Sequence, residues 1–502
     1  MSFMEQLGKT LGNEYNYSKT ENGGLGFRTT QSALLDMNFK TASYRNASES
    51  TIVDDFMKAF FEDQVLAMKW LFFARDVRGG MGERKLFRVV MTYLAKTQKE
   101  IVLKVLPLLA EYGRYDDLLV LVKTPVKTNV IELVKNQLES DMKNMEANKP
   151  ISLLAKWMPS ANTSSTETVK LANAFISYLK ITPKQYRKML SKLRSYLKIV
   201  EVAMSKKEWN AINYEAVPSK ANLLYNGAFL RNDEDRRRSY LDSLVKGEAK
   251  INAGTLYPHD IISKYVRCAG WSCSVLPMDV TLEELWKALG TTDLEDTLVV
   301  GDGSGSMYQS TIGNTKLYPG YVSIALSIYF AQGLKGTFAN KYITFGARPE
   351  LVNLTGKTLR NNIELALRNQ DCSNTNIEAV FELILRTAIN GQMTQDQMPK
   401  RVLILSDMEF DGARFNANQR LFEVIAKKFE QYGYQLPKLI FWNIASRTNT
   451  IPVIENDLGV ALVSGFSPSI TKMVMSNQTD PFEILVETLN SERYTPIAEA
   501  LQ

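Results

Sequence analysis

The sequence is most informative at Leu298-Val299-Val300-Gly301-Asp302-Gly303-Ser304-Gly305-Ser306. The apolar run predicts a buried strand, and the glycines predict a turn at which one aspartate and two hydroxyls leave that strand together. One carboxylate and two neutral oxygens in a short loop suit a hard divalent cation such as Mg²⁺. Gly/Ser-rich turns also cap helices without binding an ion, so this turn alone leaves both a metal site and a solvated loop open.

The chain beyond this turn alternates between short apolar runs and longer helical segments. We expect strands over residues 298–301, 342–345, 402–405, 439–442 and 460–463, and helices over 320–334, 377–389 and 421–429. Such alternation predicts a doubly wound, mainly parallel sheet with helices on both faces. Ligands of this architecture bind beyond the carboxyl ends of the strands.

Oxygen donors stand where that rule predicts a site. Asp407 follows the apolar run that ends at Ser406, and Thr375 lies in the loop 371–376 before the expected helix 377–389. We therefore predict a site for Mg²⁺, or for Mn²⁺ or Ca²⁺, on three loops. Its expected ligands are Asp302, Ser304, Ser306, Thr375 and Asp407.

The chain before residue 290 has a different pattern. Residues 1–50 are polar and rich in Gly, Ser, Thr and Asn, which predicts an extended arm. Residues 51–290 contain amphipathic segments joined by short turns, which predicts an all-helical domain of antiparallel hairpins, as in HEAT-like solenoids. The α/β domain is then expected over residues 291–502. The predicted fold class is α plus α/β.

Basic residues are concentrated between Lys184 and Lys207, where Glu201 is the one acid. Helical spacing places several of them on one face, which could contact a phosphate backbone while Tyr186, Tyr196 and Trp209 stack on bases. A solvated helix face whose aromatic residues lie in the core explains the same pattern. The candidate RNA-binding residues are Lys184, Arg187, Lys188, Lys192, Arg194, Lys198, Lys206 and Lys207, and Arg236 to Arg238 could assist them.

Composition sets the broad class. The 502 residues are 45% hydrophobic and 23% charged, with a net charge of +6, as in an ordinary globular protein of two or more domains. No apolar run approaches 18 residues, and the first residues lack the pattern of a signal peptide. We therefore expect a cytoplasmic protein with no membrane partner.

The cysteines and the histidine exclude several kinds of site. Cys268, Cys273 and Cys372 are an odd number, from which no disulfide framework can be read. His259 is the one histidine, so no His/Cys cluster with structural-zinc spacing can be assembled, and His259 is expected in a turn or helix start rather than a catalytic triad.

The three loops with oxygen donors resemble the von Willebrand factor A domain and its metal-ion-dependent adhesion site. That family has Asp-x-Ser-x-Ser, a later Thr, and an Asp that ends a later strand, and Asp302 to Ser306, Thr375 and Asp407 match in that order. Two positions depart from the family pattern: Gly303, where relatives commonly have a larger residue, and Asn376, where they often have an acid.

Other segments resemble an uncharacterised family of plant, fungal, bacterial and viral proteins that is related to the Ro autoantigen. The segments are residues 73–80, 155–160, 214–219, 250–254, 258–260 and 462–467. In Ro, a TROVE domain of HEAT-like helices joins an adhesion domain and binds structured and misfolded RNAs. The resemblance implies a ribonucleoprotein role, with structured or small non-coding RNA as the partner.

Three functions remain open. The first is a non-enzymatic RNA-binding scaffold whose ion contacts another molecule. The second is a protein-interaction or virion-assembly module in which the ion accepts a carboxylate from a partner protein, without RNA. The third is a phosphoryl-transfer enzyme, which is disfavoured because the chain has neither a phosphate-binding Gly-rich Lys loop nor a convincing general base.

Overall fold

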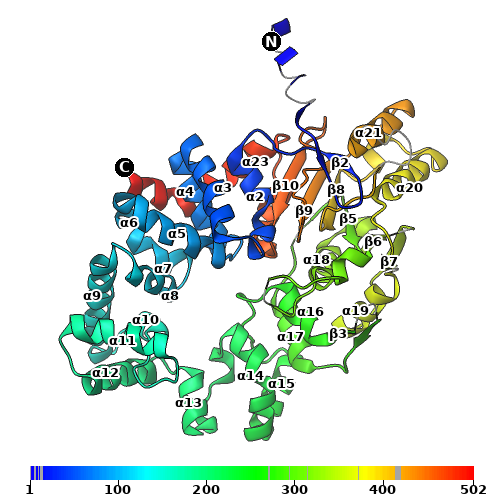
Figure 1. Ribbon diagram of the computed structural model, residues 1–502. Helices are drawn as coiled ribbons and strands as arrows, with labels where there is room; N and C mark the ends of the chain where they lie inside the picture. Colours follow the sequence, from blue (N-terminus) through cyan, green and yellow to red (C-terminus); the bar gives the residue numbers. More distant parts are fainter. Residues whose placement is uncertain are drawn as a thin grey trace. The chain divides into compact units, whose positions relative to one another are not determined.

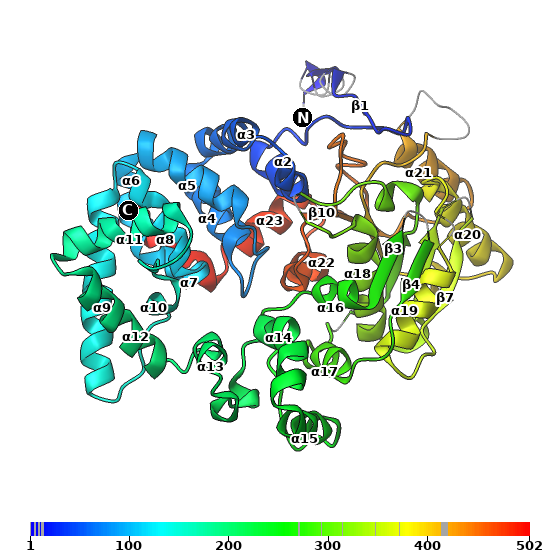
Figure 2. The same ribbon diagram turned by 60° about the horizontal axis from the view of Figure 1, so that its bottom comes forward.

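The computed structural model describes residues 2–4, 7, 8, 11 and 15–502, apart from 270, 271, 293, 314, 347, 371 and 413–419. The chain divides into two compact units. The α/β unit contains residues 1–70, 79–81 and 253–491, and the helical unit contains 71–78, 82–252 and 492–502. Figures 1 and 2 colour both units by sequence position. The expected domain ranges of 51–290 and 291–502 do not coincide with these units.

A six-stranded mixed sheet forms the centre of the α/β unit. Its strands are β5 (Thr297–Asp302), β6 (Lys341–Phe345), β7 (Glu350–Asn353), β8 (Arg401–Ser406), β9 (Lys438–Asn443) and β10 (Val460–Ser464). Their order is β10-β9-β8-β5-β6-β7, and only β6 and β7 pair antiparallel among these strands. The predicted mainly parallel sheet is confirmed, and each expected strand lies within an observed one.

Helices surround this sheet in the α/β unit, and several of them pack directly on it. They are α2 (Ala33–Phe39), α3 (Glu49–Glu62), α16 (Pro258–Tyr265), α17 (Val280–Ala288), α18 (Pro319–Gly333), α19 (Leu359–Arg368), α20 (Ile377–Asn390), α21 (Leu421–Gln431), α22 (Thr471–Met475) and α23 (Pro481–Leu489). Helix α18 packs on β5, β6 and β8, and nearly all of its residues are buried. Helix α20 packs on β6 and α21, whereas α22 and α23 pack on β10.

The first fifty residues are not an extended arm throughout. Ser32 caps helix α2 by accepting a hydrogen bond from the backbone N–H of Leu35. Within the α/β unit, the Asn38 amide donates to the Leu462 carbonyl at 3.0 Å, and the Ala42 N–H donates to Ser464 Oγ at 2.9 Å. These bonds to β10 join residues more than 400 positions apart in the sequence, so the composition of residues 1–50 alone does not predict them.

The helical unit confirms the predicted helical region. Its helices are α5 (Lys85–Thr97), α6 (Lys99–Val105), α7 (Leu109–Tyr112), α8 (Tyr115–Leu119), α9 (Lys127–Glu146), α10 (Leu154–Trp157), α11 (Thr166–Leu179), α12 (Pro183–Tyr196), α13 (Val200–Lys206), α14 (Ser219–Asn232), α15 (Glu234–Val245) and α24 (Thr495–Leu501), with α4 (Gln64–Arg75) ending in it. Helix α9 packs against α10, α11 and α12, and α14 packs against α15. No helix in the described part of the chain is long and apolar enough to span a membrane.

Two ion pairs of the helical unit have a fully buried carboxylate. Arg75 Nη2 lies 2.8 Å from Asp117 Oδ2, and both side chains are almost fully buried. Arg493 donates to both carboxylate oxygens of Asp76, at 2.5 and 2.8 Å, and Tyr494 adds a third bond. Removing one partner of such a pair leaves a buried charge, so each pair fixes the local packing.

A small hairpin contains a disulfide that the cysteine count did not reveal. Strand β3 (Val266–Ala269) pairs antiparallel with β4 (Ser272–Val275), and this register places Cys268 directly opposite Cys273. The structure bonds these two cysteines, and Cys372 takes no part in this disulfide. An odd cysteine count therefore does not prevent one local disulfide across a hairpin.

Candidate metal centre and basic helical face

The candidate metal centre lies at the carboxyl ends of β5 and β8. Asp302 is the last residue of β5, Asp407 follows β8, and the two strands are adjacent and parallel. The chain leaves β5 toward β6 on one side and later returns to β8 on the other, so the two carboxylates flank the switch point of the sheet. Both side chains are fully buried.

Hydrogen bonds connect four of the five predicted donors. Ser304 bonds Asp302 through its backbone N–H at 2.9 Å, and its hydroxyl lies 3.0 Å from the Ser306 hydroxyl. The Ser306 hydroxyl in turn hydrogen-bonds to Asp407. The turn after β5 thus connects the two carboxylates.

The loop that carries Thr375 is bound to the same turn. The Gly305 N–H donates to the Ser373 carbonyl at 2.9 Å, and the Cys372 N–H donates to the Gly303 carbonyl at 3.2 Å. Thr375 itself is buried and accepts a bond from the Asn22 amide at 3.3 Å. Asp371, which belongs to the predicted loop, lies outside the described residues.

The structure shows the local setting of both residues that depart from the adhesion-site pattern. A Cβ atom at Gly303 would lie 3.2 Å from Gln370 Cγ, which leaves little room for a larger residue. Asn376 is the N-cap of α20, where its side chain accepts a bond from the Ala379 N–H at 3.1 Å. Asn376 therefore has a structural role at the start of the helix.

Burial disfavours the charged form of both carboxyl groups. Burial, followed by the charge of the neighbouring Asp407, raises the pKa of Asp302 to about 7. Burial also raises the pKa of Asp407, against the opposing effects of the Arg447 charge and the Ser306 hydroxyl bond. A bound cation would favour the charged forms of both carboxylates.

Three residues at this site were missed by the sequence analysis. Ser406 donates to Asp302 Oδ2 at 2.5 Å, and Arg447 Nη1 donates to Asp407 Oδ2 at 3.0 Å. Glu409 is fully buried and accepts the backbone N–H groups of Arg447 and Thr448, at 2.8 and 2.9 Å. Arg447 follows β9, the next parallel strand, so the carboxyl-end rule already pointed to its loop.

The donor set fits a hard cation. Two carboxylates and three hydroxyls are the oxygen ligands that Mg²⁺ prefers, and Mg²⁺ keeps some of its waters. Among the described residues, no group of three or more His, Cys, Asp or Glu side chains could hold a metal ion. The fit therefore depends on the hydroxyls of Ser304, Ser306 and Thr375. Arg447 would share Asp407 with the ion.

One consequence of the buried carboxylates is a pH-dependent stability. An unfolded aspartate titrates near pH 4, so the folded protein binds more protons between about pH 4 and 7. Without a divalent cation, we expect the free energy of unfolding to fall as pH rises through this window, by on the order of 2–4 kcal/mol. Urea unfolding in a chelator from pH 5 to 8 measures this change.

Asp302→Asn is the matched control for that measurement, because the amide keeps the shape of the carboxyl and does not titrate. It should flatten the pH dependence, and Mg²⁺ should restore stability to the unaltered chain at the upper end of the range. If the free energy of unfolding changes with pH by the same slope in the unaltered chain and in Asp302→Asn, then Asp302 ionises in the folded protein as it does in water.

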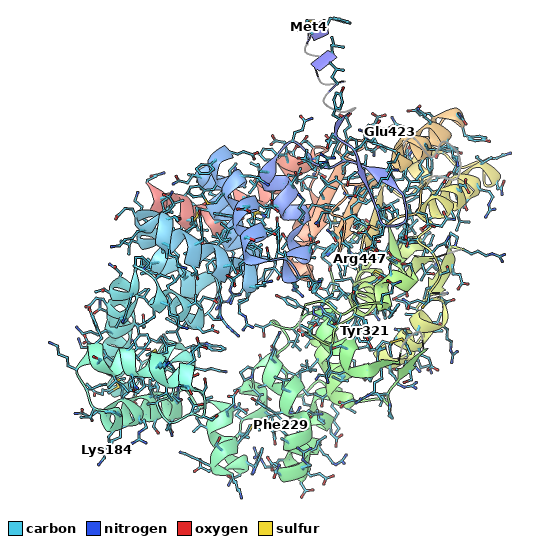
Figure 3. All side chains as sticks on the ribbon, in the orientation of Figure 1. Met4, Lys184, Phe229, Tyr321, Glu423 and Arg447 are labelled. Carbon is cyan, nitrogen blue, oxygen red and sulfur yellow. A yellow bond between two sulfur atoms is a disulfide. The ribbon has the colours of Figure 1, made fainter. Side chains whose placement is uncertain are left out.

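The basic segment forms two helices of the helical unit. Thr182 and Gln185 form a capping box at the start of α12, and Pro183 occupies its first turn. Tyr186, Leu190 and Leu193 form the buried face. The exposed basic residues are Lys184, Arg187, Lys188, Lys192, Lys198, Lys206 and Lys207. Figure 3 shows Lys184 extending away from the ribbon.

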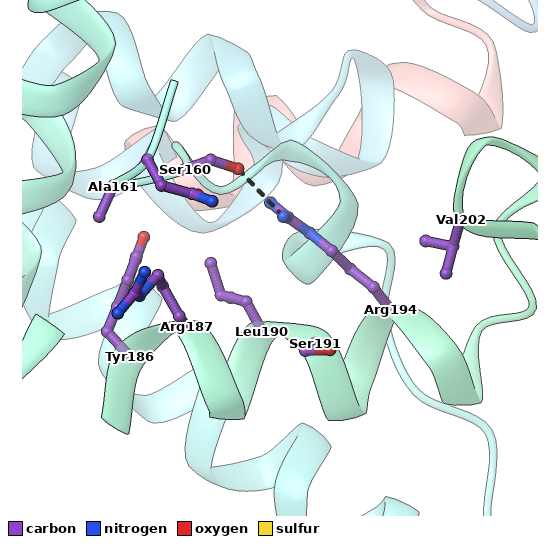
Figure 4. A pocket seen from close by; sticks show the side chains of 9 residues that line it. Ser160, Ala161, Tyr186, Arg187, Leu190, Ser191, Arg194 and Val202 are labelled. Atoms are coloured by element: carbon purple, nitrogen blue, oxygen red, sulfur yellow. Dashed lines mark hydrogen bonds between the residues drawn. The ribbon is translucent and has the colours of Figure 1, made fainter. Parts of the chain in front are cut away.

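Arg194 does not belong to this exposed face. Its guanidinium donates to the carbonyls of Ala155 and Met158, at 2.8 and 2.7 Å, and to Ser160 Oγ at 3.1 Å. Figure 4 shows Arg194 reaching from α12 to Ser160 beside a pocket of about 280 Å³. The geometry favours a structural role for Arg194, which ties α12 to the 155–160 segment.

The aromatic residues do not form a base-stacking platform here. Tyr186 is fully buried and donates its hydroxyl to the Pro159 carbonyl at 2.9 Å. Tyr196 donates to the Lys149 carbonyl at 2.9 Å, and Trp209 packs against the core around Tyr214. The geometry therefore favours the interpretation in which these aromatic residues pack in the protein interior.

The Arg236 to Arg238 cluster is also largely structural. Arg236 donates to the carbonyls of Trp209 and Ile212, at 3.0 and 2.8 Å. Arg237 is fully buried, and Arg238 pairs with Glu234 on the surface of α15. Among these candidate cations, the exposed ones without an ion pair to a described residue lie on α12 and in residues 198–207.

Comparison with known proteins gives a clear relative. The protein is 30% identical to "Uncharacterized protein L728" of Acanthamoeba polyphaga mimivirus over 524 aligned residues, which cover 96% of this chain and 89% of the mimivirus protein. The chain belongs to the L728 family. Two family models, each described as a domain of unknown function, match residues 172–296 (DUF2828) and 296–495 (DUF7788). In this protein, residues 172–296 contain the basic helices and residues 296–495 contain the candidate metal centre.

A solved structure is also similar. The crystal structure of the Ro (RSR) protein of Deinococcus radiodurans aligns with 91% of this chain and 94% of its own, at 14% identity and a TM-score of 0.36.

Proposed function

We propose that this protein is a non-enzymatic, cytoplasmic RNA-binding scaffold that also holds a divalent cation for the capture of a partner. The observation that carries the RNA proposal is the exposed face of α12 and residues 198–207. None of its seven exposed cations forms an ion pair with any residue that the structure describes, although exposed cations elsewhere, such as Lys123 and Arg238, do. Exposed cations without an ion-pair partner are available to bind phosphates.

The side chains support backbone recognition rather than base stacking. Tyr186 is buried and Tyr196 is engaged with the Lys149 carbonyl, so this face offers lysines and Arg187 to an RNA. Proteins that lack stacking residues read RNA chiefly through shape and phosphates. A structured or small non-coding RNA with helical segments is therefore the proposed partner.

Salt dependence tests this proposal. If four to seven phosphates are neutralised, a plot of log affinity against log salt should have a slope of about −4 to −6 for a short RNA hairpin. Fluorescence anisotropy over a range of potassium chloride concentrations provides the slope. An affinity that barely changes with salt would contradict phosphate contacts by this face.

A second candidate is a protein-interaction or virion-assembly module that uses the ion without RNA. It is supported by the buried pair Asp302 and Asp407 with its three hydroxyls, because Mg²⁺ seldom takes all its ligands from one protein. In this case, the proposed partner is a protein that offers a carboxylate to the ion. Mutations can distinguish the two candidate functions, because the basic face and the two carboxylates lie in different units and can be altered separately.

A further inference from the structure

A short N-terminal segment lies along the carboxyl edge of the sheet, within the α/β unit. Residues 16–27, here called the strap, contain strands β1 (Ser18–Lys19) and β2 (Leu25–Gly26), which pair antiparallel. Gly23 forms a β-bridge with Asp411, and Phe27 forms another with Ile451. In Figure 1 the strap is the blue segment around β2, beside β8. It therefore borders the loops that follow β8 and β9.

The tip of the strap contacts the candidate metal centre directly. The Asn22 amide donates to Thr375 Oγ1 at 3.3 Å and to the Glu409 carbonyl at 2.6 Å. Thr375 is one of the proposed ligands, so the Asn22 amide uses an oxygen that the ion would use.

A second contact continues to Asp407. Glu21 Oε2 lies 2.8 Å from Arg447 Nε, and Arg447 Nη1 lies 3.0 Å from Asp407 Oδ2. Arg447 is thus held between a carboxylate of the strap and a carboxylate of the site. The Glu21 backbone N–H also donates to the Glu409 carboxylate at 2.9 Å.

We propose that the strap is an autoinhibitory cap, whose Glu21 and Asn22 side chains cover the cation site and compete with an acidic partner protein for it. This inference rests on the proposed cation site. A partner protein would direct a carboxylate at the edge of the site. The strap already places the Glu21 carboxylate at this edge, from within the same chain. The partner's carboxylate reaches the ion only after the strap has moved away.

The ion pair at the tip of the strap is weak. The Glu21 side chain is 47% exposed and that of Arg447 is 29% exposed, and an ion pair this close to solvent contributes little stability. The strap strands have only two residues each, so local opening should cost far less than global unfolding. A cation that shares Asp407 would also repel the Arg447 guanidinium, which weakens the hold on Glu21.

A reversible lock tests the cap in the full chain. Ser18 Oγ and Thr450 Oγ1 lie 2.8 Å apart, so Ser18→Cys/Thr450→Cys should form a disulfide that fixes the strap when oxidised. The probes are Mn²⁺, whose bound waters relax solvent protons, and acetate as a simple carboxylate. We expect acetate to displace water from bound Mn²⁺ in the reduced variant and much less in the oxidised one. The unaltered chain, with and without reductant, controls for Cys268 and Cys273.

Point variants keep the test independent of the lock. Glu21→Gln/Asn22→Ala should raise the apparent acetate affinity about fivefold, which is the effect of losing one exposed ion pair and a hydrogen bond. Lys19→Ala is the matched control, because Lys19 is an exposed strap residue away from these contacts, and it should change nothing.

The outcomes separate the cap from the cation site. If Mn²⁺ binds but acetate acts equally on the oxidised, reduced and point-variant proteins, the cap is wrong and the cation site stands. If the unaltered chain and the point variants bind no Mn²⁺, both the cation site and the cap are wrong. Faster amide exchange of Gly24 and Phe27 on addition of Mg²⁺ would support the cap, and unchanged exchange would contradict it.

Discussion

Replacing Lys184, Lys188 and Lys192 together by alanine is expected to weaken binding of a structured RNA about 100-fold at near-physiological salt, because each lysine lost removes about one released counterion. The three residues are four positions apart on α12, so they lie on one face, and all three are exposed. Alanine is a strong helix former, so the helix itself should persist. The salt slope should become shallower by about 3.

A charge-matched control distinguishes a binding face from a general effect of net charge. Lys96→Ala/Lys99→Ala/Lys427→Ala removes the same three charges from exposed positions elsewhere. This control should retain most of the affinity. If the two triple variants weaken binding equally, α12 is not a specific RNA-binding face, and only the overall positive charge matters.

Replacing Asp302 by alanine is expected to lower the affinity for Mg²⁺ or Mn²⁺ by at least about 100-fold, since it removes one of two charged ligands from the site. Ser304 and Ser306 would remain, but neutral oxygens alone do not offset the desolvation of a divalent ion. Isothermal titration with Mn²⁺ measures this change. The variant should also lose capture of an acidic partner while it keeps RNA binding.

Asp457→Ala is the control for cation binding, because Asp457 is an exposed acid of the same unit. It should bind Mn²⁺ as the unaltered chain does. A cation affinity that is unchanged in Asp302→Ala would mean that the ion, if any, binds elsewhere. Loss of RNA binding in Asp302→Ala would show that the two proposed sites are not independent.

The sequence predicted those parts of the site that depend on strand ends. Asp302 and Asp407 each follow an apolar run, and parallel strands place their carboxyl ends at one edge of the sheet. Strand β7 was missed because three of its four residues are exposed and only Val352 is buried, which leaves no apolar run to recognise.

Other features depend on contacts between distant residues. Arg447 reaches Asp407 across 40 positions, and Glu21 and Asn22 reach Glu409 across almost 390. No local pattern marks such contacts. Similarly, charge and spacing put Arg194 with its neighbours on α12, but three hydrogen bonds turn its guanidinium inward. A sequence shows which residues carry charge but not which of them remain exposed.

Ultraviolet crosslinking of the protein to the RNA that co-purifies with it from cells, followed by mass spectrometry of the adducts, tests the scaffold proposal most directly. Adducts should occur on residues 183–207, and they should be lost in the triple variant of Lys184, Lys188 and Lys192. Absence of bound RNA from the purified protein, or adducts that occur only outside residues 183–207, would contradict the account.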